Sequence, residues 1–371
     1  MNYFIFIPHM NIGGVEKSFL TLSDQLIDKG NKVTIVTLNQ NKNSLNQNDR
    51  IEIISLNTSR SILSLFKLSK MLNEKKPDIL ISAQYYANIV AILSSVISKY
   101  KPKTILSERL HLSSTLKQYN LLKKLLLKFL VKMTYRNADL IYGNSDSVCE
   151  DLKKNYINES AKVIKILNPS SSKNIIKLSE EEVADTWISK SSEPIILYVG
   201  RLSFQKDIPT LLKTFEIITN ELNSKLLIVG DGPQRKLVEE FKLNNPEIGN
   251  QIKLIGYSKN PYKFFKYSKV FLLTSLYEGL PNVLIESQIL GTPIVATNSP
   301  GGTTEVLEGG RSGLLANVKD IQELSEKTLR ILKEENISKE LKENMDFSAR
   351  RFEPSIVTEY LISEIKKLFN N

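Results

Sequence analysis

Two glutamates with seven residues between them, Glu278 and Glu286, lie in a segment suited to ligand binding. Pro281 between them predicts the first turn of a helix, because its fixed φ suits a helix and its missing N–H would be unpaired there. At ~1.5 Å rise per residue, Glu286 falls roughly one turn into this helix and Glu278 in the loop before it. The N–H groups of residues 279–283 then lie at a helix start, which favours an anion. The pattern indicates a ligand with hydroxyls and phosphate, such as a nucleotide sugar, but an ordinary amphipathic helix has the same pattern.

A second segment carries two cations, Arg201 and Lys206, on one loop that begins at Gly200 and follows a predicted strand. Arginine can fork across two oxygens of a diphosphate, and lysine can act as a point charge. A solvated loop explains the same residues without a ligand.

Three further turns contain glycine. Gly13 and Gly14 open the first predicted helix, where a missing Cβ lets a backbone N–H approach a phosphate, although a tight strand-to-helix turn explains them equally well. The Gly-Asp-Gly-Pro turn at 230–233 is interpreted as architectural. Residues 300–305 precede another helix and add N–H groups and the carboxylate of Glu305.

Length and composition limit the class of protein. A chain of 371 residues with 41% hydrophobic and 24% charged residues is typical of a soluble protein of two domains. One cysteine, Cys149, and two histidines, His9 and His111, exclude a disulfide framework and a cysteine- or histidine-rich metal site. The apolar run at the N-terminus is too short for a signal sequence, so a cytoplasmic protein is expected. Residues 79–98 carry no charge, and we interpret them as strand, loop and helix rather than as a membrane span.

Short β-branched runs alternate with segments of 3.6-residue apolar spacing, which predicts parallel, doubly wound α/β sheets. The predicted strands are 3–7, 32–38, 51–56, 79–82, 104–107, 140–142, 163–167, 194–200, 225–229, 252–255, 270–274 and 293–296. The predicted organisation is a first Rossmann-like domain at 1–168, an irregular linker at 169–193, a second Rossmann-like domain at 194–351, and a C-terminal stretch at 352–371 whose amphipathic helix can pack back on the first domain.

Taken in order, these motifs resemble the family-4 retaining glycosyltransferases (glycosyl transferases group 1) of the GT-B fold. The resemblance rests on Gly-Gly near the start, Gly-Arg-Leu with a lysine five residues after the arginine, Gly-Asp-Gly-Pro, the two glutamates, Gly-Thr-Pro-Ile-Val-Ala and Gly-Gly-x-x-Glu. It covers nearly the whole chain and implies two Rossmann-like domains that face each other across a cleft. No Asp-x-Asp is present, so the metal-chelating alternative has no candidate residues, and neither a metal nor a cofactor is expected.

The resemblance also implies a role for each motif. Arg201 and Lys206 would bind the donor diphosphate and support the leaving nucleotide, while Gly14 would offer its N–H to the phosphate. Glu286 would hydrogen-bond the ribose, and Glu278 would contact the donor sugar. The other donor-site residues expected on this basis are Gly13, Gly200, Gly279, Leu280, Pro281 and Asn282.

The first domain offers weaker candidates. His111 follows a predicted strand and is expected to reach the reacting centre, as a histidine in a comparable loop does in many relatives; exposed polar surface is the alternative. Arg109 lies nearer the usual loop position, and His9 ends the first strand. With Glu305, these two are candidate acceptor or cleft residues.

Positive charge is concentrated in the first half of the chain: residues 1–170 carry +11 and residues 171–371 carry −1. We predict a long helix over 116–136 whose basic residues fall within about 120° of one another: Lys117, Lys124, Lys128, Lys132 and Arg136. This stripe favours contact with an anionic membrane, and a solvated helix face is the alternative. Nucleic acid is not the expected partner, because no aromatic platform and no recognised motif accompany the basic residues.

The sequence therefore predicts a metal-independent glycosyltransferase, peripheral on the cytoplasmic face of a membrane. Its reaction would move a hexose or N-acetylhexosamine from a nucleoside-diphosphate sugar, with UDP favoured, to a lipid-linked or polymer glycan acceptor. A nucleotide-sugar epimerase, a phosphorylase or a basic nucleic-acid- or lipid-binding protein remain alternatives. Retention of configuration follows from the resemblance. The sugar, base, acceptor, linkage and oligomeric state stay open.

Overall fold

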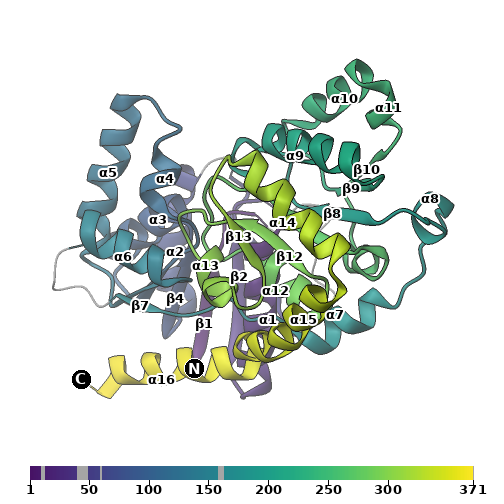
Figure 1. Ribbon diagram of the computed structural model, residues 1–371. Helices are drawn as coiled ribbons and strands as arrows, with labels where there is room; N and C mark the ends of the chain where they lie inside the picture. Colours follow the sequence, from purple (N-terminus) through teal and green to yellow (C-terminus); the bar gives the residue numbers. More distant parts are fainter. Residues whose placement is uncertain (10–12, 40–48, 59–60, 158–162, 371) are drawn as a thin grey trace. The chain divides into compact units, whose positions relative to one another are not determined.

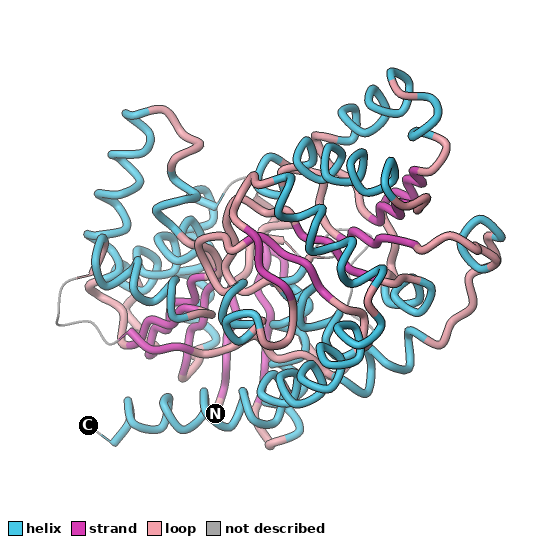
Figure 2. The backbone as a smooth tube through the Cα atoms, viewed as in Figure 1, coloured by secondary structure: helices cyan, strands magenta, loops and turns pink. Residues whose placement is uncertain are grey.

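The computed structural model describes residues 1–371 except 10–12, 40–48, 59–60, 158–162 and 371. The chain divides into two compact units, residues 1–170 with 352–371, and residues 171–351. Each unit contains a parallel sheet with helices packed on it (Figures 1 and 2). This arrangement confirms the predicted α/β class of two doubly wound domains.

The sheet of the first unit has the strand order β3-β2-β1-β4-β5-β6-β7, and every pairing is parallel. Its strands are β1 Asn2–Phe6, β2 Lys32–Thr37, β3 Glu52–Ser55, β4 Ile79–Ala83, β5 Lys103–Glu108, β6 Leu140–Gly143 and β7 Val163–Lys165. Its helices are α1 Gly14–Asp28, the 3-10 helix η1 Ser61–Ser64, α2 Leu65–Lys75, α3 Tyr85–Ile97, α4 Leu112–Leu116, α5 Leu121–Tyr135, α6 Asp146–Asn155 and α16 Pro354–Asn370.

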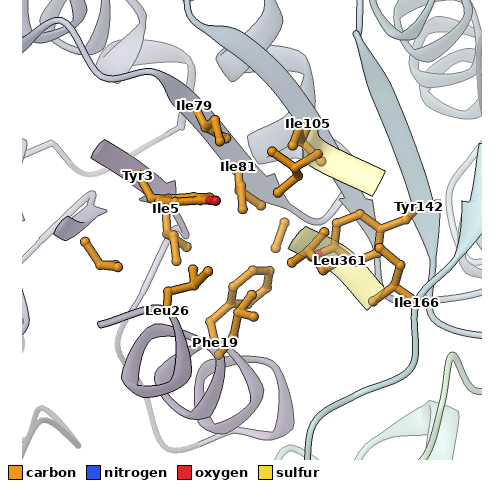
Figure 3. Packing of buried hydrophobic residues seen from close by; sticks show 14 of the residues in the cluster. Tyr3, Ile5, Phe19, Leu26, Ile79, Ile81, Ile105, Tyr142, Ile166 and Leu361 are labelled. Atoms are coloured by element: carbon orange, nitrogen blue, oxygen red, sulfur yellow. The ribbon is translucent and has the colours of Figure 1, made fainter. Parts of the chain in front are cut away.

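Burial on both faces explains why β1 is apolar at four consecutive positions, from Tyr3 to Phe6. Tyr3 and Ile5 of β1 point into one core with Phe19 of α1, which Figure 3 shows, whereas Phe4 and Phe6 point into the core beneath α2 and α3. A parallel sheet covered by helices on both faces requires such continuous hydrophobic runs.

The C-terminal helix α16 belongs to the first unit. Leu361 and Ile365 are buried in the core shared by β1, α1 and β6, and α16 lies against α1. Where the chain crosses between units, the Ser170 N–H donates to the Phe352 carbonyl at 2.8 Å. The last 20 residues thus complete a core that the first 170 begin.

The second unit has the order β10-β9-β8-β11-β12-β13, again with parallel pairings. Its strands are β8 Ile195–Val199, β9 Lys225–Val229, β10 Ile252–Gly256, β11 Val270–Leu273, β12 Ile294–Thr297 and β13 Leu314–Ala316. Its helices are α7 Ser172–Ser179, α8 Thr186–Ser189, η2 Phe204–Lys206, α9 Ile208–Glu221, α10 Arg235–Asn244, α11 Pro246–Gly249, η3 Tyr262–Tyr267, α12 Asn282–Ile289, α13 Thr303–Val306, η4 Glu308–Gly310, α14 Ile321–Lys333 and α15 Glu335–Ala349; η5 Arg350–Phe352 leads back to the first unit.

Two sequence-based expectations about this unit need revision. The three-residue strand β13 was not predicted, because so short a run has too little pattern to recognise. Residues 171–193, expected to form an irregular linker, lie in the second unit, where α7 packs on η3 and α12. Ser171 accepts from the Asn174 N–H and caps α7, and Asp185 accepts from the Trp187 N–H and caps α8.

The helix predicted over 116–136 was also wrong in its extent. Helix α4 ends at Leu116, and α5 begins at Leu121 after a turn in which the Asn120 side chain accepts from the Lys123 N–H. This cap starts a new helix, so Lys117 does not share a face with Lys124, Lys128 and Lys132. Arg136 is the C-cap residue that follows the end of α5 at Tyr135.

Among the described residues, no helix is long and apolar enough to cross a membrane. The uncharged stretch 79–98 forms β4 and α3, as predicted.

Strand order fixes where each unit can bind a ligand. The order reverses between β1 and β4 in the first unit and between β8 and β11 in the second. At such a switch point, the loops that leave the two central strands diverge to opposite sides and open a crevice at the carboxyl edge of the sheet. The loops after β8 and β11 hold Lys206 and Glu278.

We expect Leu361→Ala to destabilise the first unit by about 2–5 kcal/mol, because it removes a side chain that is 1% exposed within the core. Urea unfolding followed by fluorescence measures the loss. Tyr360→Ala is the matched control, since the neighbouring Tyr360 side chain is 47% exposed. Equal stability of the two variants would contradict the role of α16 in this core.

Candidate active site

Two loops of the second unit place Lys206 beside Glu278. The loop after β8 forms the 3-10 turn η2, and the segment after β11 crosses it: the Leu276 N–H donates to the Gln205 carbonyl at 2.8 Å, and Thr274 Oγ1 donates to the Lys206 carbonyl at 2.8 Å. These two hydrogen bonds, one from the backbone and one from a side chain, therefore hold the loops together and fix the separation of Lys206 and Glu278.

The Glu278 carboxylate is held by three donors. Oε1 accepts from Lys206 Nζ at 2.5 Å and from Ser275 Oγ at 2.6 Å, while Oε2 accepts from Gln205 Nε2 at 3.2 Å. The side chains of Lys206 and Glu278 are 14% and 6% exposed, so this ion pair is nearly dry. Bonds between a buried cation and a carboxylate are short and strongly oriented.

Glycine allows the neighbouring turns to pack against these loops. Gly230 has φ +150°, and a Cβ there would overlap the carbonyl of Gly200, at the start of the loop that carries Arg201 and Lys206. Gly301 has φ +122°, and a Cβ there would overlap the carbonyl of Glu278. The Gly-Asp-Gly-Pro turn thus has the architectural role expected of it, and the turn at 300–302 closes against the glutamate loop.

Helix α12 begins where Pro281 predicted, with Pro281 at its N-cap. Glu286 lies one turn into the helix and is 7% exposed. Its Oε1 accepts from the Tyr262 hydroxyl at 3.1 Å. Burial, followed by the charge of Glu286, raises the pKa of Tyr262 well above its usual value, so Tyr262 remains a neutral donor.

The other predicted donor-site residues of this unit lie around the same loops. Gly279, Leu280 and Pro281 are buried between Glu278 and the start of α12, Asn282 is the first residue of that helix, and Gly200 follows β8. Arg201 is exposed, unlike Lys206, and lies next to the buried Leu202. Glu305 is half-buried in α13, where its carbonyl accepts from Arg351 Nη2 at 2.7 Å.

In the first unit, His111 occupies the N-cap of α4. Its Nδ1 accepts from the Ser114 N–H at 3.3 Å and lies 3.7 Å from Asp151 Oδ2. Asp151 in turn accepts from the backbone N–H and the hydroxyl of Ser113. The imidazole is thereby fixed in orientation at the carboxyl edge of the sheet. This cap gives His111 a structural role in addition to the one predicted.

Arg109 and Glu108 are buried at the end of β5, at 5% and 1% exposure. The Arg109 guanidinium lies 5.0 Å from the centre of the Phe19 ring, and burial lowers its pKa. Glu108 accepts from the Tyr135 hydroxyl at 2.8 Å, and burial raises the pKa of Glu108 to about 7. Arg109 is therefore packed into the unit rather than placed on an open loop.

The Gly13-Gly14 pair begins α1, with Gly13 as the N-cap in an extended conformation. The Glu16 carboxylate bends back over Gly13, and burial raises the pKa of Glu16 to about 7. His9 follows β1 and is half-buried. This end of α1 lies beside the switch point of the first sheet.

Sequence reasoning missed Gln205, Ser275 and Tyr262, the three neutral residues that hold the two glutamates. Gln205 and Ser275 lie within three residues of a predicted site residue, so their nearness in sequence could have identified them as candidates. Tyr262 lies 24 residues before Glu286, and only the fold brings the two together.

Comparison with known proteins identifies the family of both units. Residues 179–350 match the family model "Glycosyl transferases group 1", and residues 12–169 match "Glycosyltransferase Family 4". The chain belongs to the group 1, family 4 glycosyltransferases. The two matches together cover both units, and the match to the second unit includes both charged loops and α12.

Relatives of this glycosyltransferase build bacterial glycans. It is 29% identical, over 97% of its length and 98% of the relative, to the Campylobacter jejuni GalNAc-α-(1→4)-GalNAc-α-(1→3)-diNAcBac-PP-undecaprenol α-1,4-N-acetyl-D-galactosaminyltransferase. It is 24% identical to the capsular polysaccharide biosynthesis glycosyltransferase CapM of Staphylococcus aureus, over 83% of this chain and 80% of CapM.

Among solved structures, Anabaena HepE in complex with UDP superposes with a TM-score of 0.79 at 17% identity, over 99% of this chain and 100% of HepE. The similarity shows that the glycosyltransferase has the GT-B fold.

The local chemistry of the second unit suits a phosphorylated sugar. A half-buried lysine and an exposed arginine on one loop supply positive charge, α12 presents its N-terminal end, and two buried carboxylates accept hydrogen bonds from hydroxyls. The loops after β8 and β11 thus bring cations and carboxylates together at one edge of the sheet.

The raised pKa of Glu108 makes stability depend on pH. Between its usual value of 4.5 and about 7, folded Glu108 keeps a proton that the unfolded chain releases, so stability falls as pH rises through this window. We expect Glu108→Gln to stabilise the protein at about pH 8 by on the order of 2–3 kcal/mol and to change little at about pH 4.

Urea unfolding of wild type and variant at the two pH values tests this expectation. Glu150→Gln, on the exposed side of α6, controls for loss of a carboxylate. A Glu108→Gln variant with the same pH dependence as wild type would show that Glu108 is not the titrating group.

Proposed function

We propose that this glycosyltransferase moves a hexose or N-acetylhexosamine from a nucleoside-diphosphate sugar, with UDP as the favoured nucleotide, to a lipid-linked or cell-surface glycan acceptor. The observation that carries the proposal is the ion pair between the half-buried Lys206 and the buried Glu278 at the switch point of the second sheet. Cation and carboxylate there match the two parts of a nucleotide sugar, the diphosphate and the sugar hydroxyls.

In this proposal the protein acts by stabilising charge. As the bond between the sugar's anomeric carbon and the diphosphate breaks, negative charge develops on the diphosphate. Lys206 and Arg201 supply placed positive charge, and the N-terminal end of α12 adds its dipole, so the proposed chemistry uses no metal.

Retention of configuration is part of the proposal. The acceptor hydroxyl forms its bond to the anomeric carbon on the face from which the diphosphate leaves, and its proton passes to a phosphate oxygen. Glu286, fixed by Tyr262, would accept from the ribose hydroxyls. Glu278 would accept from the sugar.

The acceptor side of the proposal rests on relatives and on the first unit. The Campylobacter relative is named for an undecaprenol-diphosphate-linked saccharide, and CapM is named for capsular polysaccharide biosynthesis. We place the acceptor against the first unit, with His111, Arg109 and His9 as candidate contacts, and the enzyme at the cytoplasmic face of the membrane.

Helix α5 is the proposed membrane contact. It carries Lys124, Lys128 and Lys132, and its exposed apolar residues are Leu121, Leu122, Leu125, Leu126, Phe129 and Met133. Figure 1 shows α5 as an outlying helix of the first unit. No acidic residue occurs between Glu108 and Asp139. Lysines beside exposed leucines suit an anionic lipid surface, whereas a second copy of the helix would bring like charges together.

We expect Lys206→Ala and Arg201→Ala each to reduce turnover by about 10²-fold or more, because each removes a charge that stabilises the leaving diphosphate. Initial rates with the identified donor and acceptor measure the loss. Lys213→Ala, an exposed lysine on α9, is the control. Near-normal rates in both site variants would refute the diphosphate assignment.

We expect the triple variant Lys124→Glu, Lys128→Glu, Lys132→Glu to bind anionic vesicles at least about tenfold more weakly, since each basic residue contributes on the order of 1 kcal/mol. Vesicle sedimentation measures binding, and donor affinity should be unaltered. Lys75→Glu, Lys153→Glu, Lys154→Glu changes the charge of the same unit equally and is the control. Equal losses in the two triple variants would mean that net charge, not α5, governs binding.

A further inference from the structure

We propose that the ion pair between Lys206 and Glu278 makes the site select nucleotides that carry a sugar over the bare nucleoside diphosphate. This inference rests on the proposed function and concerns the regulation of the same site. It follows from the bonding of Glu278, because the cation expected to meet the diphosphate is paired with the carboxylate expected to meet the sugar.

The geometry makes the pair a competitor of the donor. Lys206 Nζ lies 2.5 Å from Glu278 Oε1, and the two side chains are 14% and 6% exposed. Ser275 holds the same oxygen at 2.6 Å, and Gln205 holds the other oxygen and the Tyr277 carbonyl. Because Glu278 is anchored from two sides, Lys206 is the partner that must move when a diphosphate approaches.

Removing Lys206 from a buried carboxylate is unfavourable, because the carboxylate keeps its charge in a poorly hydrated place. A bare nucleoside diphosphate draws Lys206 away and offers Glu278 no hydrogen-bond donor in its place. A carboxylate offers about four lone-pair sites, and Lys206, Ser275 and Gln205 occupy three of them in the described structure. A sugar hydroxyl can donate to Glu278 as Lys206 turns toward the phosphates.

The consequence is a difference in affinity between substrate and product. The sugar of the donor gives Glu278 a hydrogen bond in place of Lys206, whereas the nucleoside diphosphate left after transfer does not. Lys206 therefore returns to Glu278, and the product is released. A neutral side chain at 278 abolishes the competition: Lys206 is then available to either ligand, and the sugar has lost its acceptor.

The test compares dissociation constants in wild type and Glu278→Gln, measured by calorimetry with UDP, GDP, ADP and their glucose conjugates. We expect wild type to bind the conjugate of its preferred nucleotide more tightly than the bare nucleotide. In Glu278→Gln, we expect the bare nucleotide to bind at least about tenfold more tightly than it binds wild type. The preference for the conjugate should disappear.

Glu323→Gln is the matched control, because Glu323 pairs with Lys327 on α14 at the same 2.5 Å distance. Its affinities should equal those of wild type. Bare-nucleotide binding by Glu278→Gln that is unchanged or weaker would overturn the inference and leave the proposed function standing. A folded wild-type protein that binds none of the six ligands would refute the proposed function itself.

A ligand-free measurement tests the ion pair independently. Lys206→Met should lower the melting temperature, because it leaves Glu278 buried without its cation. Adding Glu278→Gln to Lys206→Met should restore part of the loss. If the losses of the two single variants simply add in the double variant, the two side chains are not coupled, and the inference fails even in a protein that binds its donor.

Discussion

The candidate site depends on one constraint: a half-buried lysine and a buried glutamate must lie side by side where both can contact a ligand. Lys206 and Glu278 come from different loops, 72 residues apart in the chain. The sheet brings these loops together because β8 and β11 are neighbours at the point where strand order reverses. A backbone bond from Leu276 and a bond from the Thr274 hydroxyl then hold one loop against the other. Close approach of Gly230 and Gly301 to their neighbours completes the support.

The two units divide the chemistry by charge. The second unit is nearly neutral overall. The two positive charges proposed to contact the ligand, Arg201 and Lys206, lie on a single loop. The first unit carries the whole excess of positive charge, part of it on α5 among exposed leucines. Two cations held on one loop suit catalysis on a diphosphate. Basic residues distributed along a helix beside apolar side chains suit an extended anionic surface. The two distributions therefore support two different proposed partners, a nucleotide sugar and a membrane.

Much of this architecture was predictable from sequence, for reasons visible in particular elements. Strands such as β1 and β9 are apolar at every position after the first because both faces are buried there, and Pro281 marks the start of α12 by its own backbone chemistry. The break between α4 and α5 was missed because the apolar spacing continues through the turn, where α4 ends at Leu116 and Asn120 caps the next helix. The partners of the glutamates were missed because hydrogen bonds such as Tyr262 to Glu286 are set by the fold.

The most direct test of the central claim is a thermal-shift measurement on the purified protein, without added metal, against UDP, GDP, ADP and their common sugar conjugates. A ligand that binds only the folded state raises the melting temperature. The account predicts a clear rise with one nucleotide class, larger for its sugar conjugate than for the bare nucleotide. No rise with any of these ligands, in a protein shown to be folded, would contradict the assignment of the Lys206 and Glu278 region as a nucleotide-sugar site.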